Sequence, residues 1–299
     1  MSKLLTLLLA AATLAIATAV PSTVVADEQK SILVTGASSG IGRNLTEMLA
    51  ENGYHVYAGA RKDADLAELD AIDNVTAVRL DVTSQEQIDA AVAMIREKGT
   101  GLWGLVNNAG VGGGGPVMET SIDDQSFVYR INVEGVYRTT KAFAPLVIES
   151  GGRIATTGSI AGTLSPMSYS AYSGSKHWIE SFTDSLAAEM EPHGVAVSVI
   201  EPGSYKSKIR RNSASRRLAE LEAAGGEVSE EMKQQLQATA EDELAMKEPD
   251  EVSEAFMHEL FDAAQLRRYL VVPREEEQAR TIGKKIDELV QLNEWGPYQ

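Results

Sequence analysis

The chain has 299 residues, 43% of them hydrophobic, so it can bury one large core without requiring a second domain. Its net charge of −16 argues against nucleic acid or an anionic membrane surface as the main partner. The absence of cysteine excludes disulfides, thiolate metal sites and cysteine nucleophiles, and the four histidines form no ligand-spaced cluster. We therefore expect no metal site.

An unbroken apolar run, residues 4–20, follows Lys3, and small residues come after it at Val24 and Ala26. This pattern is typical of a secretory signal cleaved after Ala26. The run is also close to the shortest membrane span, so residues 1–26 are interpreted as a signal peptide or an N-terminal membrane anchor. Both interpretations place the rest of the chain outside the cytoplasm, exported to a periplasm or membrane-anchored. An anchor whose body faces the cytoplasm stays open as an alternative.

The first predicted strand, residues 31–35, leads into the glycine-rich sequence Gly36-Ala-Ser-Ser-Gly40-Ile-Gly42, and a helical pattern follows. A strand, a glycine turn and a helix place backbone N–H groups at a helix N-terminus, where a pyrophosphate is favoured. The spacing differs from the common G-x-G-x-x-G fingerprint. The flanking strand and helix nevertheless indicate a dinucleotide site.

The second predicted strand, residues 55–60, is followed by Arg61, and no acidic residue occurs before Asp63. An acid at this place takes the ribose 2′-OH of NAD, whereas an arginine accommodates the 2′-phosphate of NADP. We therefore expect NADP(H) to be favoured over NAD(H). The alternative is that Arg61 is a solvated residue at a strand end.

Strand and helix patterns alternate along the rest of the chain. Such alternation predicts an α/β fold with a doubly wound parallel sheet, a Rossmann fold, in a single domain over residues 27–299. Ligands of these sheets bind at the C-terminal ends of the strands. Further strands are expected at residues 75–80, 102–107, 153–157, 195–200 and 269–272, and further helices at residues 84–97, from 122 onward, from 172 to 191 and at 251–260. A glycine run, residues 112–115, is expected to be flexible.

Tyr172 and Lys176 are four residues apart at the start of a predicted helix, so their side chains should share one face. A free phenol titrates near pH ~10, and a neighbouring ammonium lowers that pKa toward neutrality. Ser159 follows the strand at residues 153–157, where its hydroxyl can hold a carbonyl oxygen. The alternative is that Tyr172 and Lys176 form an ordinary surface pair.

The chain resembles the short-chain dehydrogenase/reductase family over residues 31–273, and within it the compact single-domain branch of retinol and hydroxysteroid dehydrogenases. The subgroup likeness rests on Val197-Ser-Val-Ile-Glu-Pro-Gly203 and on a late strand, residues 268–273. The family likeness rests on Thr35-Gly36-Ala-Ser-Ser-Gly40-Ile-Gly42, Asn107-Asn-Ala-Gly110, Asn132, Ser159, Tyr172-Ser-Gly-Ser-Lys176 and Pro202-Gly203.

The resemblance implies that Tyr172 is the general acid/base and that Lys176 lowers its pKa and binds the nicotinamide ribose. It also implies that Ser159 orients the substrate oxygen, that Asn132 supports a water in a proton relay, and that the chain forms a homodimer or homotetramer. The implied cofactor contacts are Gly36, Ser38, Ile41 and Gly42 at the pyrophosphate, Asp81, Val82 and Asn108 along the adenosine, and Pro202, Gly203 and Tyr205 near the nicotinamide. Ser207 stands where the family often has a threonine that holds the carboxamide.

Residues 204–247 form a charged, helix-forming segment that follows the sixth strand, where a substrate lid would lie. Its first part is basic, which indicates either a solvated helix face or attraction of an anionic substrate or the cofactor phosphate. The basic residues are Lys206, Lys208, Arg210, Arg211, Arg216 and Arg217.

The sequence thus predicts an enzyme, an NADP(H)-dependent oxidoreductase that interconverts an alcohol and a carbonyl of a small, hydrophobic molecule. The cofactor supplies the hydride and the protein supplies orientation and the proton. The alternative is a catalytically silent nucleotide-binding protein of the same fold. Retention of Asn132, Ser159, Tyr172 and Lys176 favours the enzyme. An exported location conflicts with the cytoplasmic pool of free NADP(H).

Overall fold

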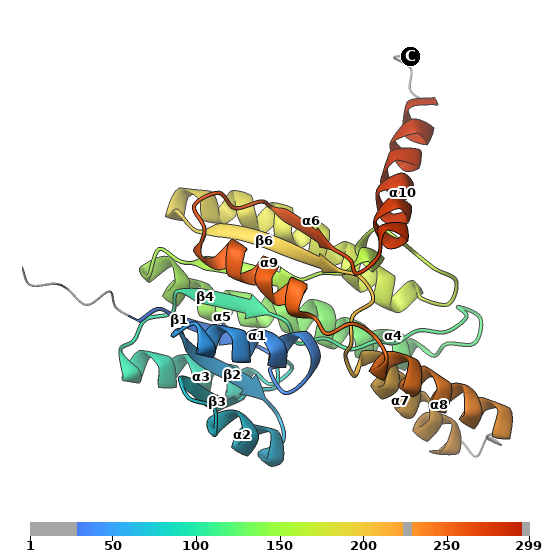
Figure 1. Ribbon diagram of the computed structural model, residues 1–299, viewed down its shortest axis with the longest axis horizontal. Coiled ribbons are helices and arrows are strands. Elements are labelled where there is room, and N and C mark those ends of the chain that lie inside the picture. The colour runs from blue at the N-terminus through green and yellow to red at the C-terminus, as the bar shows by residue number, and fades with distance from the viewer. Residues whose placement is uncertain (1–28, 224–228, 295–299) are drawn as a thin grey trace, which may run out of the picture.

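The computed structural model describes residues 29–223 and 229–294 (Figure 1). Seven parallel strands form one sheet in the order β3-β2-β1-β4-β5-β6-β7. The doubly wound parallel sheet predicted from the sequence is therefore confirmed. The strands are β1 (Ser31–Val34), β2 (His55–Ala60), β3 (Val75–Arg79), β4 (Gly104–Asn107), β5 (Arg153–Thr157), β6 (Ala196–Pro202) and β7 (Arg268–Val271).

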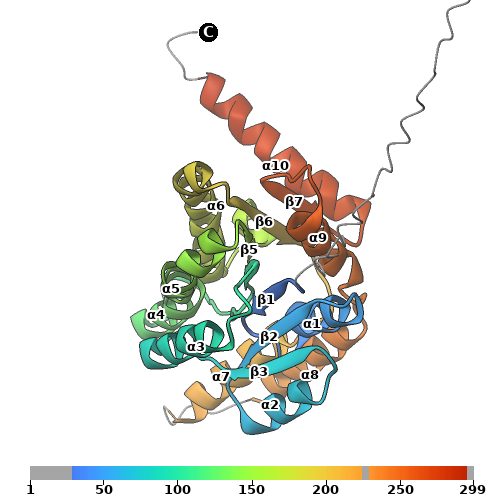
Figure 2. The same ribbon diagram turned by 90° about the vertical axis from the view of Figure 1, so that its left-hand side faces the viewer.

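Helices cover both faces of the sheet (Figure 2). Most of them begin or end within a few residues of the predicted bounds, whereas α2 was not predicted. The helices are α1 (Gly40–Glu51), α2 (Asp63–Asp70), α3 (Gln85–Lys98), α4 (Ile122–Tyr129), α5 (Val136–Glu149), α6 (Ser170–Met190), α7 (Ile209–Ala223), α8 (Glu230–Leu244), α9 (Asp250–Phe261) and α10 (Glu275–Glu294).

The two faces of the sheet bury separate apolar clusters. Ile32 and Val34 of β1 point to the face covered by α1 and α9, where they join a cluster that includes Phe256. Leu33 points to the face covered by α3, α5 and α6 and joins a cluster that includes Phe143. A strand buried on both faces needs apolar residues at every position, which explains why the run at β1 is continuous rather than alternating.

A π-helical turn, Arg130–Gly135, joins α4 to α5 within the helix expected from residue 122 onward. Asn132 lies in this turn and is 1% exposed, so it is neither a solvated residue nor a simple kink. A Cβ at Gly135 would come too close to the side chain of Val82, 3.1 Å from its Cβ. The glycine thus permits the close approach between the π-helical turn and the loop after β3. Single π turns inside α-helices are frequent at functional sites.

Two segments lie outside the α/β/α layers. Helices α7 and α8 pack against each other beyond the C-terminal ends of the strands, in the segment predicted as a substrate lid (Figure 1). Helix α10 extends away from the sheet (Figure 1). Within residues 29–223 and 229–294, no helix is both long enough and apolar enough to span a bilayer. The predicted signal or anchor, residues 1–26, falls outside the described residues.

Candidate active site

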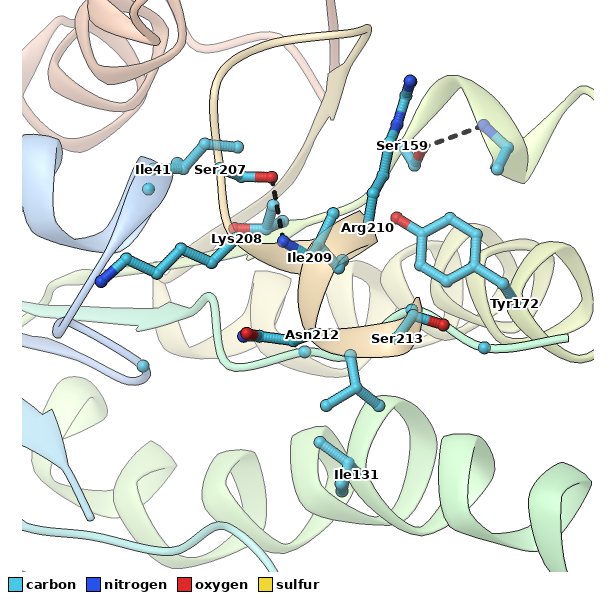
Figure 3. A pocket seen from close by; sticks show the side chains of 18 of the residues that line it. Ile41, Ile131, Ser159, Tyr172, Ser207, Lys208, Ile209, Arg210, Asn212 and Ser213 are labelled. Atoms are coloured by element: carbon cyan, nitrogen blue, oxygen red, sulfur yellow. Dashed lines mark hydrogen bonds between the residues drawn. The ribbon is translucent and has the colours of Figure 1, made fainter. Parts of the chain in front are cut away.

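A cavity of about 1090 Å³ opens at the C-terminal ends of the strands, between the sheet and helices α7 and α8 (Figure 3). Nearly all residues predicted for the site line it, although they come from the ends of six different strands and the segments that follow them. Gly42 and Asn132 lie outside the lining. The predicted residues in the lining are Gly36, Ser38, Ile41, Arg61, Asp81, Val82, Asn108, Ser159, Tyr172, Lys176, Pro202, Gly203 and Tyr205.

The turn between β1 and α1 can be built only with glycine at its key positions. Gly36 has a φ of +67°, and a Cβ there would lie 2.8 Å from the Cα of Ala109. A Cβ at Gly42 would run into the carbonyl of Gly36. Ser39, the N-cap of α1, makes no capping bond with its side chain, and the first turn holds no acid. The positive end of α1 is therefore suited to an anion such as a pyrophosphate.

Buried hydrogen bonds tie the ends of β1, β4 and β5 into one framework, which we call the sheet wall of the cavity. The hydroxyl of Thr35 accepts from the backbone N–H groups of Asn108 and Ala109, each at 3.0 Å. The amide of Asn108 donates to the carbonyl of Thr35 at 3.0 Å, and Thr157 donates to Oδ1 of Asn108 at 3.1 Å. Asn108 thus lines the cavity with its amide already committed to this framework.

Arg61 and Asp81 lie together at the strand end that the sequence indicated for the adenosine ribose. The closest approach of guanidinium and carboxylate is 3.9 Å, and the Arg61 side chain is 62% exposed. Burial alone would raise the pKa of Asp81. Hydrogen bonds from Thr83 and the charge of Arg61 outweigh burial and hold that pKa below its usual value. Arg61 is thus only loosely bound and free to meet another anion.

Ser159, Tyr172 and Lys176 meet in the cavity. The hydroxyl of Tyr172 points toward Ser159, whose Oγ accepts from the backbone N–H of Ala161 at 3.1 Å (Figure 3). Lys176 is 6% exposed, and its Nζ donates to the carbonyl of Thr157 at 2.8 Å. The same Nζ lies 5.7 Å from the centre of the Tyr172 ring. The surface-pair alternative does not hold, because the lysine is buried.

The pKa of Tyr172 corrects a prediction from the sequence. Burial raises this pKa above its usual value, and a hydrogen bond with Ser159 and the charge of Arg210 offset burial only in part. The expected lowering by Lys176 is not found, because its Nζ is bonded to the Thr157 carbonyl rather than to the phenol. Burial lowers the pKa of Lys176 to about 8, against the charge of Glu180, which raises it. At neutral pH, Tyr172 is therefore a neutral phenol and the neighbouring Lys176 is a cation.

Asn132 holds the loop after β4 against α6. Its Oδ1 accepts from the backbone N–H of Val111 at 2.8 Å, and its Nδ2 donates to the carbonyl of Val111 and to Oγ of Ser175, each at 3.0 Å. Ser175 lies next to Lys176 in the chain and is itself fully buried. The contact with a relay water stays a prediction. What the side chain does here is position two elements that carry the site.

Tyr205 and Ser207 are less available than predicted. The hydroxyl of Tyr205 donates to Oε2 of Glu251 at 2.6 Å, so the phenol turns away from the cavity that the residue lines. The hydroxyl of Ser207 donates to Oε1 of Glu243 at 3.0 Å. Glu243 is 2% exposed and was not singled out from the sequence, where it stands among other acids of a charged run.

Helices α7 and α8 form the opposite side of the cavity, which we call the helical wall. The glycine run at residues 112–115 packs beneath it, since a Cβ at Gly112 would lie 3.2 Å from the carbonyl of Ile209. A Cβ at Gly113 would lie 2.9 Å from the guanidinium of Arg216. The run was expected to be flexible. Its glycines instead serve close packing between the loop after β4 and α7.

Comparisons with known proteins identify the family of the chain. The family model described as short chain dehydrogenase matches residues 30–218. The chain is 39% identical over 186 residues to mitochondrial D-beta-hydroxybutyrate dehydrogenase of Mus musculus, which covers 59% of this chain and 54% of the mouse protein. It is 36% identical over 187 residues to retinol dehydrogenase 16 of Rattus norvegicus, covering 61% of this chain and 59% of the rat protein. The chain thus spans little more than half the length of these relatives.

Solved structures share the fold over most of the chain. A short chain dehydrogenase/reductase of Burkholderia phymatum in complex with NAD superposes with a TM-score of 0.73 and 27% identity, covering 88% of this chain and 95% of that one. Serine dehydrogenase complexed with NADP⁺ superposes with a TM-score of 0.70 and 25% identity, covering 81% and 94%. Similar folds therefore hold either nicotinamide cofactor.

Proposed function

The chain belongs to the short-chain dehydrogenase family, and we propose that it is an NADP(H)-dependent oxidoreductase that interconverts an alcohol and a carbonyl. The observation that carries this proposal is the meeting of Ser159, Tyr172 and Lys176 in the cavity that the glycine turn of β1 and α1 opens into. A protein that only binds nucleotide has no need to bring these three side chains together. The relatives act on substances as different as hydroxybutyrate and retinol by name, so the substrate stays open.

The residues present fit a nicotinamide dinucleotide. The glycine turn and the start of α1 would hold the pyrophosphate, and Asp81, Val82 and the framework around Asn108 would border the adenosine. Lys176 would meet the nicotinamide ribose, and Pro202 with Gly203 would border the nicotinamide. When bound, the cofactor supplies or accepts the hydride.

The protein moves the proton and holds the reacting oxygen. The raised pKa keeps Tyr172 a neutral phenol, which is the form that donates a proton to a carbonyl oxygen during reduction. Ser159 holds the same oxygen by its hydroxyl. Lys176 is cationic below its pKa of about 8 and would bind the nicotinamide ribose beside these groups. Asn132 holds helix α6 and the loop after β4 in place around these groups.

A preference for NADP(H) is supported by Arg61. Its guanidinium lies at the end of β2, lines the cavity, and has only the 3.9 Å contact with Asp81 to occupy it. A 2′-phosphate on the adenosine ribose would place two negative charges within reach of this cation.

We also propose that residues 27–299 act as a single oxidoreductase domain that pairs with a second copy. A groove between α5 and α6 supports the pairing, since aromatic side chains line it and Tyr137 is 53% exposed. Trp178 and Phe182 stack there with ring centroids 4.6 Å apart. Export or membrane anchoring by residues 1–26 stays a prediction, and the mature N-terminus together with cell fractionation tests it.

The function is tested by turnover of a panel of alcohols and carbonyl compounds with NADP(H) and NAD(H), followed by nicotinamide absorbance. We expect turnover with at least one compound and a higher kcat/KM for NADPH than for NADH. Binding of NADPH without turnover of any compound would favour the silent nucleotide-binding protein. Absence of both binding and turnover would reject a role for nicotinamide altogether.

A further inference from the structure

Helix α7 turns one face toward the cavity, and that face carries two arginines. Arg210 and Arg217 both line the cavity, and the residues between them on the same face are Ser213 and Ala214. Positions that are three, four and seven residues apart share a helix face. The two guanidinium groups therefore project from α7 two turns apart, about 10 Å along the helix axis. The helical wall thus presents positive charge to the space above the reacting residues.

These two arginines differ from Arg216 of the same helix, which has carboxylate partners. Arg216, between them in the sequence, pairs with Asp124 at 3.0 Å and with Glu220 at 2.7 Å. Among the residues that the structure describes, neither Arg210 nor Arg217 has an acidic oxygen within ion-pair distance. The chain has 43 acidic and 27 basic residues, so acids are not scarce. Arg210 and Arg217 both line the cavity, where a ligand anion can reach them.

Arg210 is held in place by its backbone. Its N–H donates to Oε1 of Glu243 at 2.9 Å, and the N–H of Arg211 donates to Oε2 at 3.1 Å. Glu243 is buried, so this anchor fixes where the Arg210 side chain begins. Within the described part of the chain, the guanidinium itself has one hydrogen bond, to the hydroxyl of Ser204 at 3.2 Å. The guanidinium of Arg210 is thus free to bind a ligand, whereas the backbone of the residue is fixed.

The direction of Arg210 places it with the substrate rather than with the cofactor phosphates. In Figure 3 the Arg210 side chain runs upward past Ser159, whereas Lys208 extends in another direction, to the side of the view where Ile41 lies. The charge of Arg210 is close enough to favour the ionised form of Tyr172. A ligand anion bound to Arg210 would therefore lie near the carbon that reacts.

We propose that the substrate is a hydroxy acid, or the oxo acid made from it, whose carboxylate binds the Arg210 guanidinium while its reacting oxygen lies between Ser159 and Tyr172. This inference rests on the proposed function. In reduction, the carbonyl carbon of the oxo acid gains a hydride from the reduced nicotinamide and its oxygen gains the proton of the Tyr172 phenol, giving the hydroxy acid and the oxidised cofactor. The carboxylate is unchanged and serves only to hold the substrate. A guanidinium and a carboxylate can form paired, charge-assisted hydrogen bonds.

The experiment compares each acid with its own methyl ester, which keeps the carbon chain and removes the charge. Short 2-, 3- and 4-hydroxy acids and their esters are assayed in the wild-type protein, in Arg210→Met and in the control Arg211→Met. Arg211 has the same kind of backbone anchor, but its side chain does not line the cavity. We expect the wild-type protein to prefer one acid over its ester by about 10- to 100-fold in kcat/KM. Arg210→Met should remove this preference by lowering turnover of the acid alone, and Arg211→Met should keep it.

The outcomes separate this inference from the proposed function. Turnover of neutral alcohols or esters with no preference for acids, or an equal loss on both in Arg210→Met, would overturn the inference and leave the oxidoreductase intact. Loss of the preference in Arg217→Met but not in Arg210→Met would also overturn it, since the carboxylate would then bind two turns away. Absence of turnover of every hydroxy acid would also overturn the inference, and the wider panel of alcohols and carbonyl compounds then decides the proposed function by itself. NADPH fluorescence and thermal unfolding check that each variant is folded.

Discussion

The two walls of the cavity are held in different ways. The sheet wall is bound together by hydrogen bonds among buried groups, such as those of Thr35, Asn108 and Thr157. The helical wall depends on ion pairs that are partly open to solvent, such as Lys206 with Glu248, whose side chains are 35% and 57% exposed. Its buried anchor is Glu243. Exposed ion pairs contribute roughly 0–1 kcal/mol each, whereas an unpaired buried polar group costs about 1–3 kcal/mol.

This difference matches the two tasks that we assign to the walls. The proton-transfer groups and the cofactor turn need fixed geometry, and they stand on the sheet wall, where a shift would leave buried groups unpaired. The substrate must enter and leave, and the helical wall can open by giving up contacts that contribute little. Substitutions in the sheet wall should therefore affect chemistry or global stability, and those in the helical wall should affect substrate binding and local opening.

The largest effect is expected at Tyr172. Tyr172→Phe removes the proton donor and leaves the ring in place, so kcat should fall by about 10²- to 10⁴-fold. NADPH binding should be unchanged, because the glycine turn and Lys176 are untouched. Tyr169→Phe is the matched control: Tyr169 is 47% exposed and lacks a lysine four residues later, and its loss of hydroxyl should change kcat by less than about threefold. Turnover of Tyr172→Phe at the wild-type rate would reject the assigned chemistry.

The next effect tests the support behind the sheet wall, where Asn132 holds the loop after β4. Asn132→Ala removes all three side-chain hydrogen bonds and leaves the partly buried N–H and carbonyl of Val111 without these partners. Two such groups should lower the free energy of unfolding by about 2–5 kcal/mol, measured by urea denaturation. Asn52→Ala is the control, since Asn52 is an exposed helix C-cap with one bond to Met48, and we expect a loss below about 1 kcal/mol. Equal losses in the two variants would contradict the framework role of Asn132.

The fold could be predicted from the sequence because each strand and each helix shows its own pattern of apolar residues within a short stretch of the chain. Buried parallel strands are continuous apolar runs, and the helices between them carry apolar residues on one face. Helix α2 was missed for the same reason: within Asp63–Asp70 Leu69 is the buried residue, so no apolar face marks the segment. The π-helical turn could not be foreseen, because it depends on bonds from Asn132 to Val111 and Ser175, which are distant in the chain.

The residues of the site could be predicted from the sequence, but the pKa values of their side chains could not. Ser159, Tyr172 and Lys176 were brought together as expected because each follows a strand end or begins the next helix. The direction of the Tyr172 pKa was wrong, since it depends on burial and on where the Lys176 ammonium points. Glu243 could not be identified from the sequence, because only its burial in the fold distinguishes it from the neighbouring acidic residues.

The anchor of the helical wall supplies the third prediction. Glu243→Gln keeps the size of the side chain but removes the charge that accepts from Ser207, Arg210 and Arg211. We expect the opening free energy of α7 and α8 to fall by about 1–2 kcal/mol, seen as faster amide hydrogen exchange there, while exchange in β1 to β5 stays unchanged. KM for substrate should rise more than kcat falls. The exposed neighbour Glu241→Gln should change neither quantity, and faster exchange throughout the sheet would show that the two walls are not independent.

The smallest effect is expected at Arg61, at the edge of the sheet wall, and concerns the preference between NADPH and NADH. Arg61→Ala removes a guanidinium that is 62% exposed and only 3.9 Å from Asp81 at its closest, so stability should hardly change. The kcat/KM for NADPH should fall by about 10-fold, since one charge-assisted contact with the 2′-phosphate is lost. NADH is the internal control, because it differs from NADPH only in lacking that phosphate, and its kcat/KM should stay within about twofold. Equal losses of kcat/KM for both cofactors would mean that Arg61 supports the end of β2 and does not bind the 2′-phosphate. The cofactor preference would then depend on another cation of the cavity, such as Lys62.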